Sequence, residues 1–354
     1  MLVIGLMSGT SLDGVDAAVL ETDGETNIHA GPALTLPFAP SLRADLRGLL
    51  DQAETLAADD PGLLAVERAL TLHHVDAVRA LGVAVDLIGF HGQTILHRPQ
   101  AGRTWQIGDA ALLAAETGTR VAHDFRSADV AAGGQGAPLV PAYHAALAAS
   151  FALPVAVLNI GGVANITWIG PDGALAAWDT GPGCALLDDF CARHLGVPMD
   201  AGGQLAASGT PNEAVLAQLL AAPYFARPAP KSLDRQDFAH ALALVETLAL
   251  ADAAATQASF TARAVWATPM GAPTRLLVTG GGRHNAAIMA ALRAASPCPV
   301  APVEDAGWDG DALEAQCFAY LAARVSRGLP LSFPGTTGVP RPWPGGRITQ
   351  PGAA

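Results

Sequence analysis

The chain begins with a strand-turn-strand pattern whose turn consists of small and polar residues. An apolar run, 2–6, leads into Ser8-Gly9-Thr10-Ser11, and the polar turn Leu12-Asp13-Gly14 precedes a second apolar run, 15–20. This pattern predicts a β-hairpin whose tip presents backbone N–H groups and hydroxyls, with glycines where a Cβ would prevent close approach. Such a tip can bind phosphate through backbone amides alone. Taken singly, the pattern also fits an ordinary hairpin turn.

Two related glycine patterns occur further along the chain. Around 155–169, a Gly161-Gly162 turn joins two strand-like runs and is flanked by Asn159 and Asn165. Around 275–292, a buried-type strand meets three glycines, and an apolar-periodic helix follows. None of the three patterns matches the dinucleotide fingerprint or the Walker P-loop. Together they favour a nucleotide held between two related lobes, with its phosphates at the hairpins and its adenosine at the third loop.

Short motifs follow one another along nearly the whole chain. They are GLMSGTSLDGVD at 5–16, GFHGQTI at 89–95, QIGD at 106–109, DFR at 124–126, GGQGAPLVP at 133–141, NIGG at 159–162, DTGPG at 179–183, TGGG at 279–282 and EA at 314–315. In this ordered set the chain resembles the anhydro-N-acetylmuramic acid kinases, a family of the actin, sugar-kinase and heat-shock ATPase superfamily. The resemblance implies an α/β, two-lobed actin-like ATPase fold, in which a ribonuclease H-like unit is duplicated around a central nucleotide cleft.

The resemblance also implies a reaction. Water opens the internal bridge of 1,6-anhydro-N-acetylmuramic acid, and the freed O6 takes the γ-phosphoryl group of ATP. The products are N-acetylmuramic acid 6-phosphate and ADP, and the pathway is peptidoglycan recycling. ATP and Mg²⁺ are the implied cofactors, and a homodimer is the implied assembly. The alternatives are a related sugar kinase with another substrate and a non-catalytic ATP-binding protein.

Length and composition limit the other possibilities. A chain of 354 residues exceeds a usual single core, so we expect a first lobe at 1–130 and a second at 131–327, with the tail 328–354 packing back on the first lobe as one option. A net charge of −12 with only 20 Lys and Arg residues argues against a nucleic-acid partner. No uninterrupted apolar run reaches the roughly 18 residues that span a membrane, and no signal peptide is evident. Four cysteines without Cys-x-x-Cys spacing favour a reducing, cytoplasmic setting.

Asp179 is the predicted catalytic residue. It follows a strand-like run and precedes Thr-Gly-Pro-Gly, a tight turn that would fix a carboxylate at the mouth of the lobe. Such a carboxylate can act as a general base. An isolated aspartate here could instead cap the following helix, but the resemblance places the catalytic base of the family at this position.

The resemblance also assigns the nucleotide-binding residues. These are Ser8, Gly9, Thr10, Ser11, Leu12, Asp13, Gly14 and Asp16 of the first hairpin, Asn159, Gly161 and Gly162 of the second, and Gly280, Gly281, Gly282 and Asn285 of the third loop. Asn285 could alternatively be only a helix cap. The superfamily usually carries an aspartate near the position of Met7, so the magnesium ligands stay unassigned, with Asp13 or Asp16 acting through water as one option.

The predicted sugar-binding residues are His91, Gln93, Gln106, Asp109, Arg126, Gln135 and Glu314. The substrate carries a lactyl carboxylate, and Arg126 is the best-placed cation for it, although Asp129 is near enough in sequence to be an ion-pair partner instead. Each histidine could be purely structural. Glu314 could instead stabilise a helix N-terminus through the helix dipole.

Two departures from the family pattern are evident. Cys184 stands where the family commonly has Asn after Asp-Thr-Gly-Pro-Gly, and a thiol is a weaker hydrogen-bonding group than an amide. Lys231-Ser-Leu-Asp-Arg235 resembles a family Lys-Ser-Thr-Gly-Arg segment with two substitutions, and its Lys231 and Arg235 could be no more than surface charges.

Overall fold

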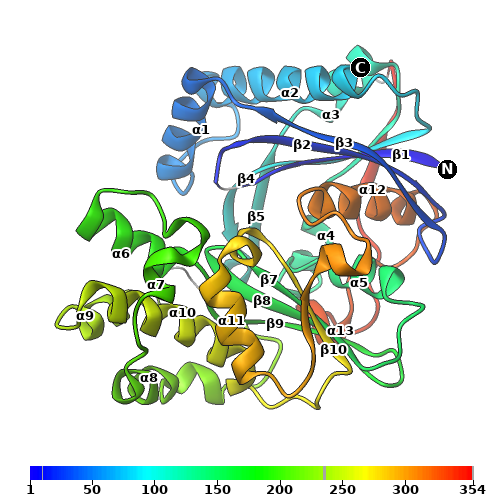
Figure 1. Cartoon of the computed structure of the whole chain (residues 1–354). Helices are drawn as coiled ribbons and strands as arrows, with labels where there is room; N and C mark the ends of the chain where they lie inside the picture. The colour runs from blue at the N-terminus through cyan, green and yellow to red at the C-terminus, as the bar shows by residue number, and fades with distance from the viewer. Residues whose placement is uncertain (10, 234–236, 353–354) are drawn as a thin grey trace. The chain divides into compact units, whose positions relative to one another are not determined.

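The computed structural model describes residues 1–9, 11–233 and 237–352. The chain forms two compact units, one made of residues 1–149 with 311–354 and the other of residues 150–310 (Figure 1). The predicted nucleotide residue Thr10, and Asp234 and Arg235 of the lysine segment, lie outside the described residues. In the part of the chain that is described, no helix is long and apolar enough to cross a membrane.

The first unit is built on a mixed sheet with the strand order β12-β6-β4-β1-β2-β3, and β5 pairs with β4 beside this path. β1, β2 and β3 form an antiparallel meander, whereas β4 runs parallel to β1 and β6 parallel to β4. The strands are β1 (Leu2–Ser8), β2 (Gly14–Thr22), β3 (Ile28–Pro37), β4 (Leu87–Arg98), β5 (Arg103–Ile107), β6 (Val121–His123) and β12 (Arg347–Thr349).

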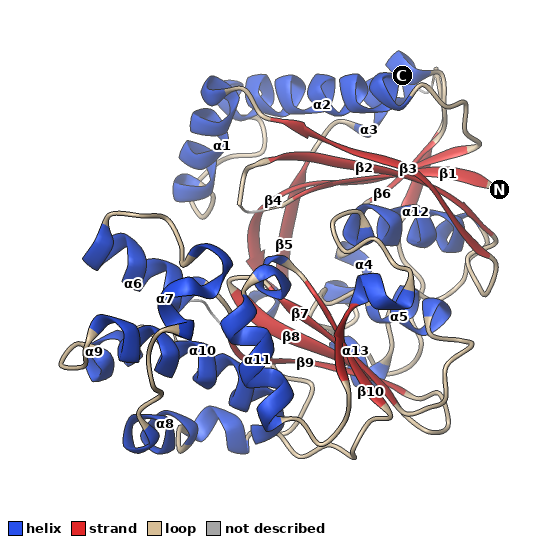
Figure 2. Ribbon diagram, viewed as in Figure 1, coloured by secondary structure: helices blue, strands red, loops and turns tan. Residues whose placement is uncertain are grey.

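Helices cover both faces of this sheet, with α2 on one side and α12 on the other (Figure 2). Asp60 caps α2 by accepting a hydrogen bond from the N–H of Leu63, and Gly82 ends the helix with a φ of 64°. The helices of the unit are α1 (Pro40–Gln52), α2 (Pro61–Leu81), α3 (Ala110–Thr117), α4 (Ser127–Ala131), α5 (Pro141–Leu147), α12 (Leu313–Ser326) and α13 (Pro334–Thr337), with a 3₁₀ turn η1 (Pro99–Ala101).

Two glycines let α12 approach the sheet closely. A Cβ on Gly5 of β1 would lie 1.8 Å from the carbonyl oxygen of Ala315, and a Cβ on Gly89 of β4 would lie 2.1 Å from that of Phe318. No side chain can occupy either position at this spacing. The glycines therefore determine how the helix lies on the sheet.

The second unit repeats the strand order of the first. Its sheet runs β11-β10-β7-β8-β9, with an antiparallel β7-β8-β9 meander and with β10 and β11 parallel to β7. The strands are β7 (Val155–Ile160), β8 (Val163–Ile169), β9 (Leu175–Pro182), β10 (Arg275–Thr279) and β11 (Val300–Pro302). The same order occurs in the first unit as β6-β4-β1-β2-β3. The predicted α/β fold with a duplicated unit is confirmed.

The core of the second unit lies between its sheet and α10, which presents buried alanines such as Ala254, Ala258 and Ala262 to strand residues that include Leu158 and Ile166. The helices are α6 (Ala185–Leu195), α7 (Gln204–Ala207), α8 (Glu213–Leu220), α9 (Ala241–Val245), α10 (Leu250–Ala267) and α11 (Ala286–Ala295). The 3₁₀ turns are η2 (Ala201–Gly203), η3 (Pro223–Ala226), η4 (Gly281–His284) and η5 (Val303–Ala306).

Two local expectations differ from the structure. The contacts place 131–149 and 311–327 in the first unit rather than the second, because α12 packs on β1, β2 and β4 and contacts α5. The sequence His91-Gly-Gln-Thr94 predicts a loop after a strand, but these residues belong to β4, and β5 pairs with Gln93 and Thr94.

Candidate functional site

Asp179 lies on β9 of the second unit, where the pairing with β8 shifts by one residue. Asn165 pairs with Asp179, whereas Ala164 pairs with Gly181, so Thr180 is the extra residue of a β-bulge. A bulge changes the direction of the side chains next to it. The alternative role as a helix cap is not what the structure shows, because the N-cap residue of α6 is Cys184 and that cap has no side-chain hydrogen bond.

Asp179 is held by hydrogen bonds to its N–H, its carbonyl oxygen and its carboxylate. Its N–H donates to the carbonyl oxygen of Lys231 at 2.9 Å, and its carbonyl oxygen accepts from the hydroxyl of Tyr224 at 2.6 Å. The carboxylate Oδ2 accepts from the N–H of Leu233 at 2.7 Å. Burial raises the pKa of the Asp179 carboxyl from 3.8 to about 6, while the Leu233 hydrogen bond acts in the opposite direction. A carboxylate with a pKa near neutrality can take up a proton and release it again.

The Gly161-Gly162 turn packs against the start of α6. The N–H groups of Gly183 and Ala185 donate to the carbonyl oxygen of Gly162 at 2.9 and 3.2 Å, and that of Cys184 donates to Gly161 at 2.8 Å. Burial raises the pKa of the Cys184 thiol to about 12, so the side chain is a neutral thiol near pH 7. The DTGPG motif and the second glycine turn are thus one contiguous structure.

The third glycine loop lies against the same turn. A Cβ on Gly280, which has a φ of 79°, would lie 2.3 Å from Oδ1 of Asn159. A Cβ on Gly282 would lie 2.3 Å from Cγ2 of Ile160 and 3.2 Å from Sγ of Cys184, whereas one on Gly281 would meet nothing within 4 Å. The structure therefore brings together the predicted nucleotide residues Asn159, Gly161, Gly162, Gly280, Gly281 and Gly282.

Asn285 has the role of a helix cap. Its Oδ1 accepts a hydrogen bond from the N–H of Ile288 at 3.0 Å, and its Nδ2 donates to the carbonyl oxygen of Asp200 at 3.5 Å. The residue is buried. Both ends of its amide are engaged within the protein, and a contact with adenosine stays a prediction.

The first hairpin tip has buried and exposed residues side by side, with Leu12 buried and Asp13 exposed. Ser8 is buried, and its hydroxyl donates to the carbonyl oxygen of Gly92 at 3.2 Å. Leu12 has a φ of 58°, and its N–H donates to Gly9 at 3.1 Å. A Cβ on Gly14 would lie 2.4 Å from the carbonyl oxygen of Leu36, so β2 and β3 require a glycine there. Gly9 is partly exposed and Ser11 is exposed, so both can be reached from solvent.

Four carboxylates near this hairpin influence one another. The pKa of Asp16 is raised mainly by burial and further by Asp311 and Asp13, although a hydrogen bond from Thr35 at 2.6 Å opposes this shift. Part of Glu314 reaches solvent, yet desolvation of its carboxyl and then the charge of Asp16 raise its pKa. Among the described residues, no group of three or more His, Cys, Asp or Glu side chains is arranged to hold a metal ion. Oxygen ligands of this kind nevertheless suit Mg²⁺ bound through water.

Arg126 is partly buried and contacts His91, another of the predicted sugar-binding residues. Its Nε donates to Nε2 of His91 at 3.0 Å, and its NH1 donates to the carbonyl oxygen of Gly136 at 2.8 Å. Asp129, the alternative ion-pair partner, instead accepts hydrogen bonds from Gly136, Ser332 and Thr337. The negative charge of Glu314 partly offsets the effect of burial, which lowers the pKa of Arg126.

The other predicted sugar-binding residues have local partners. Gln106 donates to the hydroxyls of Thr94 and Thr104 at 3.1 and 2.9 Å. Asp109 caps α3 through the N–H of Leu112 at 2.9 Å, which is a structural role.

Two predicted sugar-binding glutamines, Gln135 and Gln93, differ in their hydrogen bonds within the protein. Gln135 accepts from Gln100 at 3.4 Å, and its N–H donates to Thr337 at 2.7 Å. Gln93 is fully buried, and its Oε1 has no hydrogen-bond partner in the described part of the chain.

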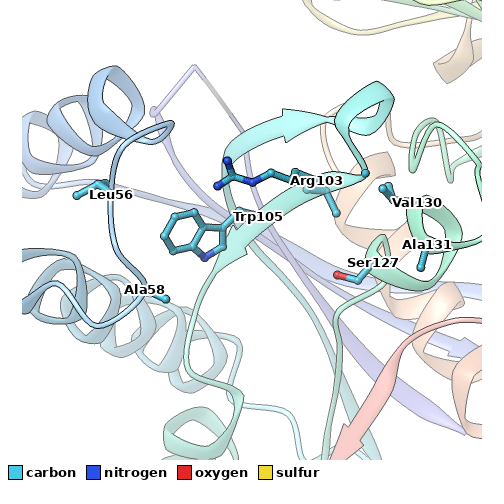
Figure 3. Close-up of a pocket in the computed structure, with 9 residues that line it drawn as sticks. Leu56, Ala58, Arg103, Trp105, Ser127, Val130 and Ala131 are labelled. Atoms are coloured by element: carbon cyan, nitrogen blue, oxygen red, sulfur yellow. The ribbon is translucent and has the colours of Figure 1, made fainter.

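Two hollows on the first unit share Thr104, Trp105 and Ser127. The smaller, of about 220 Å³, is lined by His91 and Gln106 among others. The larger, of about 410 Å³, contains none of the predicted sugar-binding residues; Figure 3 shows the Trp105 ring between Leu56 and Ala58 on one side and Ser127 on the other. Volume alone therefore does not identify the sugar site, and the chemistry of the lining favours the smaller hollow.

Sequence reasoning missed the residues that hold Asp179. Lys231, considered a possible surface charge, is buried, so that interpretation is wrong. Tyr224 was not singled out at all. One signal was available, because Lys231 is the single lysine in a chain with 20 Lys and Arg residues.

The strand order repeated in the two units is typical of the actin-like fold. The family model described as Anhydro-N-acetylmuramic acid kinase matches residues 1–351, and the chain belongs to this family. It is 60% identical over 356 residues to the anhydro-N-acetylmuramic acid kinase of Acidiphilium cryptum (strain JF-5), covering 100% of this chain and 99% of the relative. It is 58% identical over 356 residues to that of Gluconobacter oxydans (strain 621H), covering 97% and 98%.

Proposed function

We propose that the protein is an ATP-dependent kinase that opens 1,6-anhydro-N-acetylmuramic acid with water and phosphorylates its O6. Family membership supports the reaction class. The observation that carries the chemistry is the Asp179 carboxylate, held by the Leu233 N–H and with a pKa raised to about 6. The family match does not favour the two alternatives, another sugar substrate or a binding-only role.

Asp179 acts as the base. As it takes a proton from water, the water oxygen bonds to the anomeric carbon and the C1–O6 bond breaks. The electron pair of that bond stays on O6, which forms a bond to the γ-phosphorus of ATP while the bond to the ADP oxygen breaks. The products are N-acetylmuramic acid 6-phosphate and ADP, and the proton leaves Asp179 afterwards. Positioning and charge stabilisation account for the rest of the catalysis.

The nucleotide residues form two sets. The Ser8–Asp16 hairpin and the Gly161-Gly162 turn bind phosphates through backbone N–H groups, and the Gly280–Gly282 loop contacts the adenosine, where the Gly281 position is open. Mg²⁺ would neutralise charge on the phosphates, and Asp13, Asp16 and Glu314 are the candidate residues to hold it through water.

The sugar-binding residues lie in the first unit. Arg126 binds the lactyl carboxylate because a guanidinium suits carboxylate recognition. Gln106 contacts hydroxyls at the smaller hollow, whose lining includes His91. Both ring nitrogens of His91 are engaged within the protein, so it acts by positioning Arg126. Gln93 is fully buried and supports the site from within.

The setting we propose is the cytoplasm, with a homodimer as the assembly. Cys184, Cys191, Cys298 and Cys317 are all free thiols, as is usual in a reducing compartment. The homodimer is suggested by the family resemblance.

The test is turnover in oxygen-18 water with ATP, magnesium and the anhydro-sugar, for the unmodified protein and for Asp179→Asn. We expect a phosphorylated product with one heavy oxygen at the anomeric carbon, and no such product from the variant. An unmodified protein that binds ATP but yields no sugar phosphate would refute the proposal.

A further inference from the structure

Lys231 is the one lysine of the chain, and it is buried beside the proposed base. The chain has 20 Lys and Arg residues, so cationic positions elsewhere are arginines. Lys231 is only 6% exposed. Lysine side chains are almost never fully buried unless their charge is compensated. The buried Lys231 ammonium group must therefore be compensated by specific contacts.

The ammonium group of Lys231 is bound by a neighbouring 3₁₀ turn, η3. Its Nζ donates to the carbonyl oxygens of Tyr224 at 3.0 Å and Phe225 at 3.4 Å. It also lies 4.5 Å from the centre of the Tyr224 ring, in the geometry of a cation–π contact. A compact ammonium with three rotatable donors can make all these contacts at once, whereas the planar guanidinium of arginine has a fixed fork.

This anchor fixes the segment that holds Asp179. Residues 231–233 belong to no helix or strand, so ladder hydrogen bonds do not support them. The carbonyl oxygen of Lys231 and the N–H of Leu233 nevertheless bind Asp179 on both sides of Ser232, at 2.9 and 2.7 Å. The Leu233 side chain packs in the apolar cluster of Phe225 and Phe238. The Lys231 side chain is the polar tie between this segment and η3.

We propose that Lys231 is a positioning residue for Asp179, because its ammonium group holds the 231–233 segment from which the Leu233 N–H orients the carboxylate. The inference rests on the proposed role of Asp179 as the base. Within the described part of the chain, the other charged and titratable groups around the cluster are Arg227, which lies 5.4 Å over the same Tyr224 ring, the Tyr224 hydroxyl, and Asp237, which acts on Tyr224.

The first experiment compares Lys231→Met with the unmodified protein in steady-state kinetics from pH 5 to 9. The Leu233 N–H favours the ionised carboxylate, so its loss should move the acidic limb of kcat upward by about one pH unit. We expect kcat at pH 7 to fall at least about tenfold through misalignment, with KM for ATP unchanged. An acidic limb that coincides with that of the unmodified protein, or a loss that is equal at every pH, would overturn the inference.

Arg227→Met is the matched control. Arg227 is exposed and also lies over the Tyr224 ring, so the variant removes a cation from the same ring without touching the Lys231 contacts. Its kcat and its pH profile should equal those of the unmodified protein. A shift as large as that of Lys231→Met would attribute the effect to general charge and overturn the inference.

A second measurement keeps Lys231 intact, so it does not depend on whether a Lys231 variant folds. Because the chain has one lysine, ¹⁵N-lysine labelling gives a single backbone amide signal in NMR. We expect this signal to titrate with a midpoint near 6, the pKa of Asp179, and to lose that titration in Asp179→Asn. A signal that does not titrate would overturn the inference. Absence of sugar phosphorylation by the unmodified protein would instead refute the proposed function and leave this coupling standing.

Discussion

Nε of Arg126 donates a hydrogen bond to Nε2 of His91 at 3.0 Å, and this contact fixes the tautomer of the imidazole. Because Nε2 accepts, the ring proton is on Nδ1, which donates to the carbonyl oxygen of Gly92 at 2.8 Å. Burial, and then the charge of Arg126, lower the pKa of His91 well below 6.5. His91 is therefore a neutral side chain at physiological pH and serves to position Arg126 rather than to transfer protons.

Arg126→Lys should weaken sugar binding selectively. Lysine keeps the charge, but its donors all sit on one nitrogen, so it cannot span the separate Nε and NH1 contacts with His91 and Gly136 and also reach the substrate. We expect KM for the anhydro-sugar to rise roughly tenfold, with KM for ATP unchanged. Arg98→Lys is the control, since Arg98 forms an exposed ion pair with Glu54 at 3.2 Å and an exposed hydrogen bond to the carbonyl oxygen of His97. Equal effects of the two substitutions on KM would contradict the assignment of Arg126.

Asp179→Asn should abolish turnover and stabilise the protein at high pH. The folded-state pKa of about 6 exceeds the ordinary 3.8, so the folded protein binds a proton more tightly than the unfolded chain. The free energy of unfolding therefore falls as pH rises from about 4 to about 6. Above that range the ionised Asp179 carboxylate destabilises the folded protein by a constant amount. We expect the variant to be more stable by up to about 3 kcal/mol at pH 8. Urea unfolding at pH 8 and pH 4 measures this; a gain that does not shrink toward pH 4 would exclude the ionised carboxylate as its source.

Gly5→Ala should destabilise the first unit strongly. The new Cβ would lie 1.8 Å from the carbonyl oxygen of Ala315, a backbone atom of α12 that cannot rotate away. We expect a loss of at least about 3 kcal/mol in the free energy of unfolding. In contrast, Gly48→Ala lies within α1, where a Cβ meets nothing within 4 Å, and should stabilise by about 1 kcal/mol. Thermal unfolding measures the change in Tm for both variants. Similar changes in Tm would contradict the close contact between α12 and the sheet.

The Cys184 thiol should react slowly although it is partly accessible. Its pKa, raised to about 12 by burial and then by Asp188, leaves very little thiolate at pH 8. We expect iodoacetamide to modify Cys184 far more slowly in the folded protein than in denaturant, as read by mass spectrometry of its peptide. Rapid labelling of the folded protein would mean that the thiol is not in this environment.

The turns of the site were predictable from sequence because glycine patterns are local signals. Gly161-Gly162 forms the turn between β7 and β8, and Gly280 and Gly282 lie where a Cβ would come within 2.3 Å of Asn159 and Ile160. Asp179 was recognisable through its motif. Its pKa was not, because it depends on burial and on Leu233, which is 54 positions away.

Long-range partners explain the remaining differences. Asp129 lies near Arg126 in sequence, but its carboxylate accepts hydrogen bonds from Ser332 and Thr337, more than two hundred positions away. Residues 91–94 resemble a loop until β5 pairs with two of them. The boundary of the first unit could not be predicted, because α12 returns to Gly5 and Gly89 only after the whole second unit.

That return of α12 has a consequence for biosynthesis. Residues 150–310 form an insertion within the first unit, so the emerging chain exposes one face of the β1–β4 sheet until the last part of the chain has been made. The inserted unit can fold on the ribosome while its host is still incomplete. Chaperone dependence during translation should therefore concentrate on the first unit, and a stalled or truncated product should contain a folded insertion attached to an unprotected sheet.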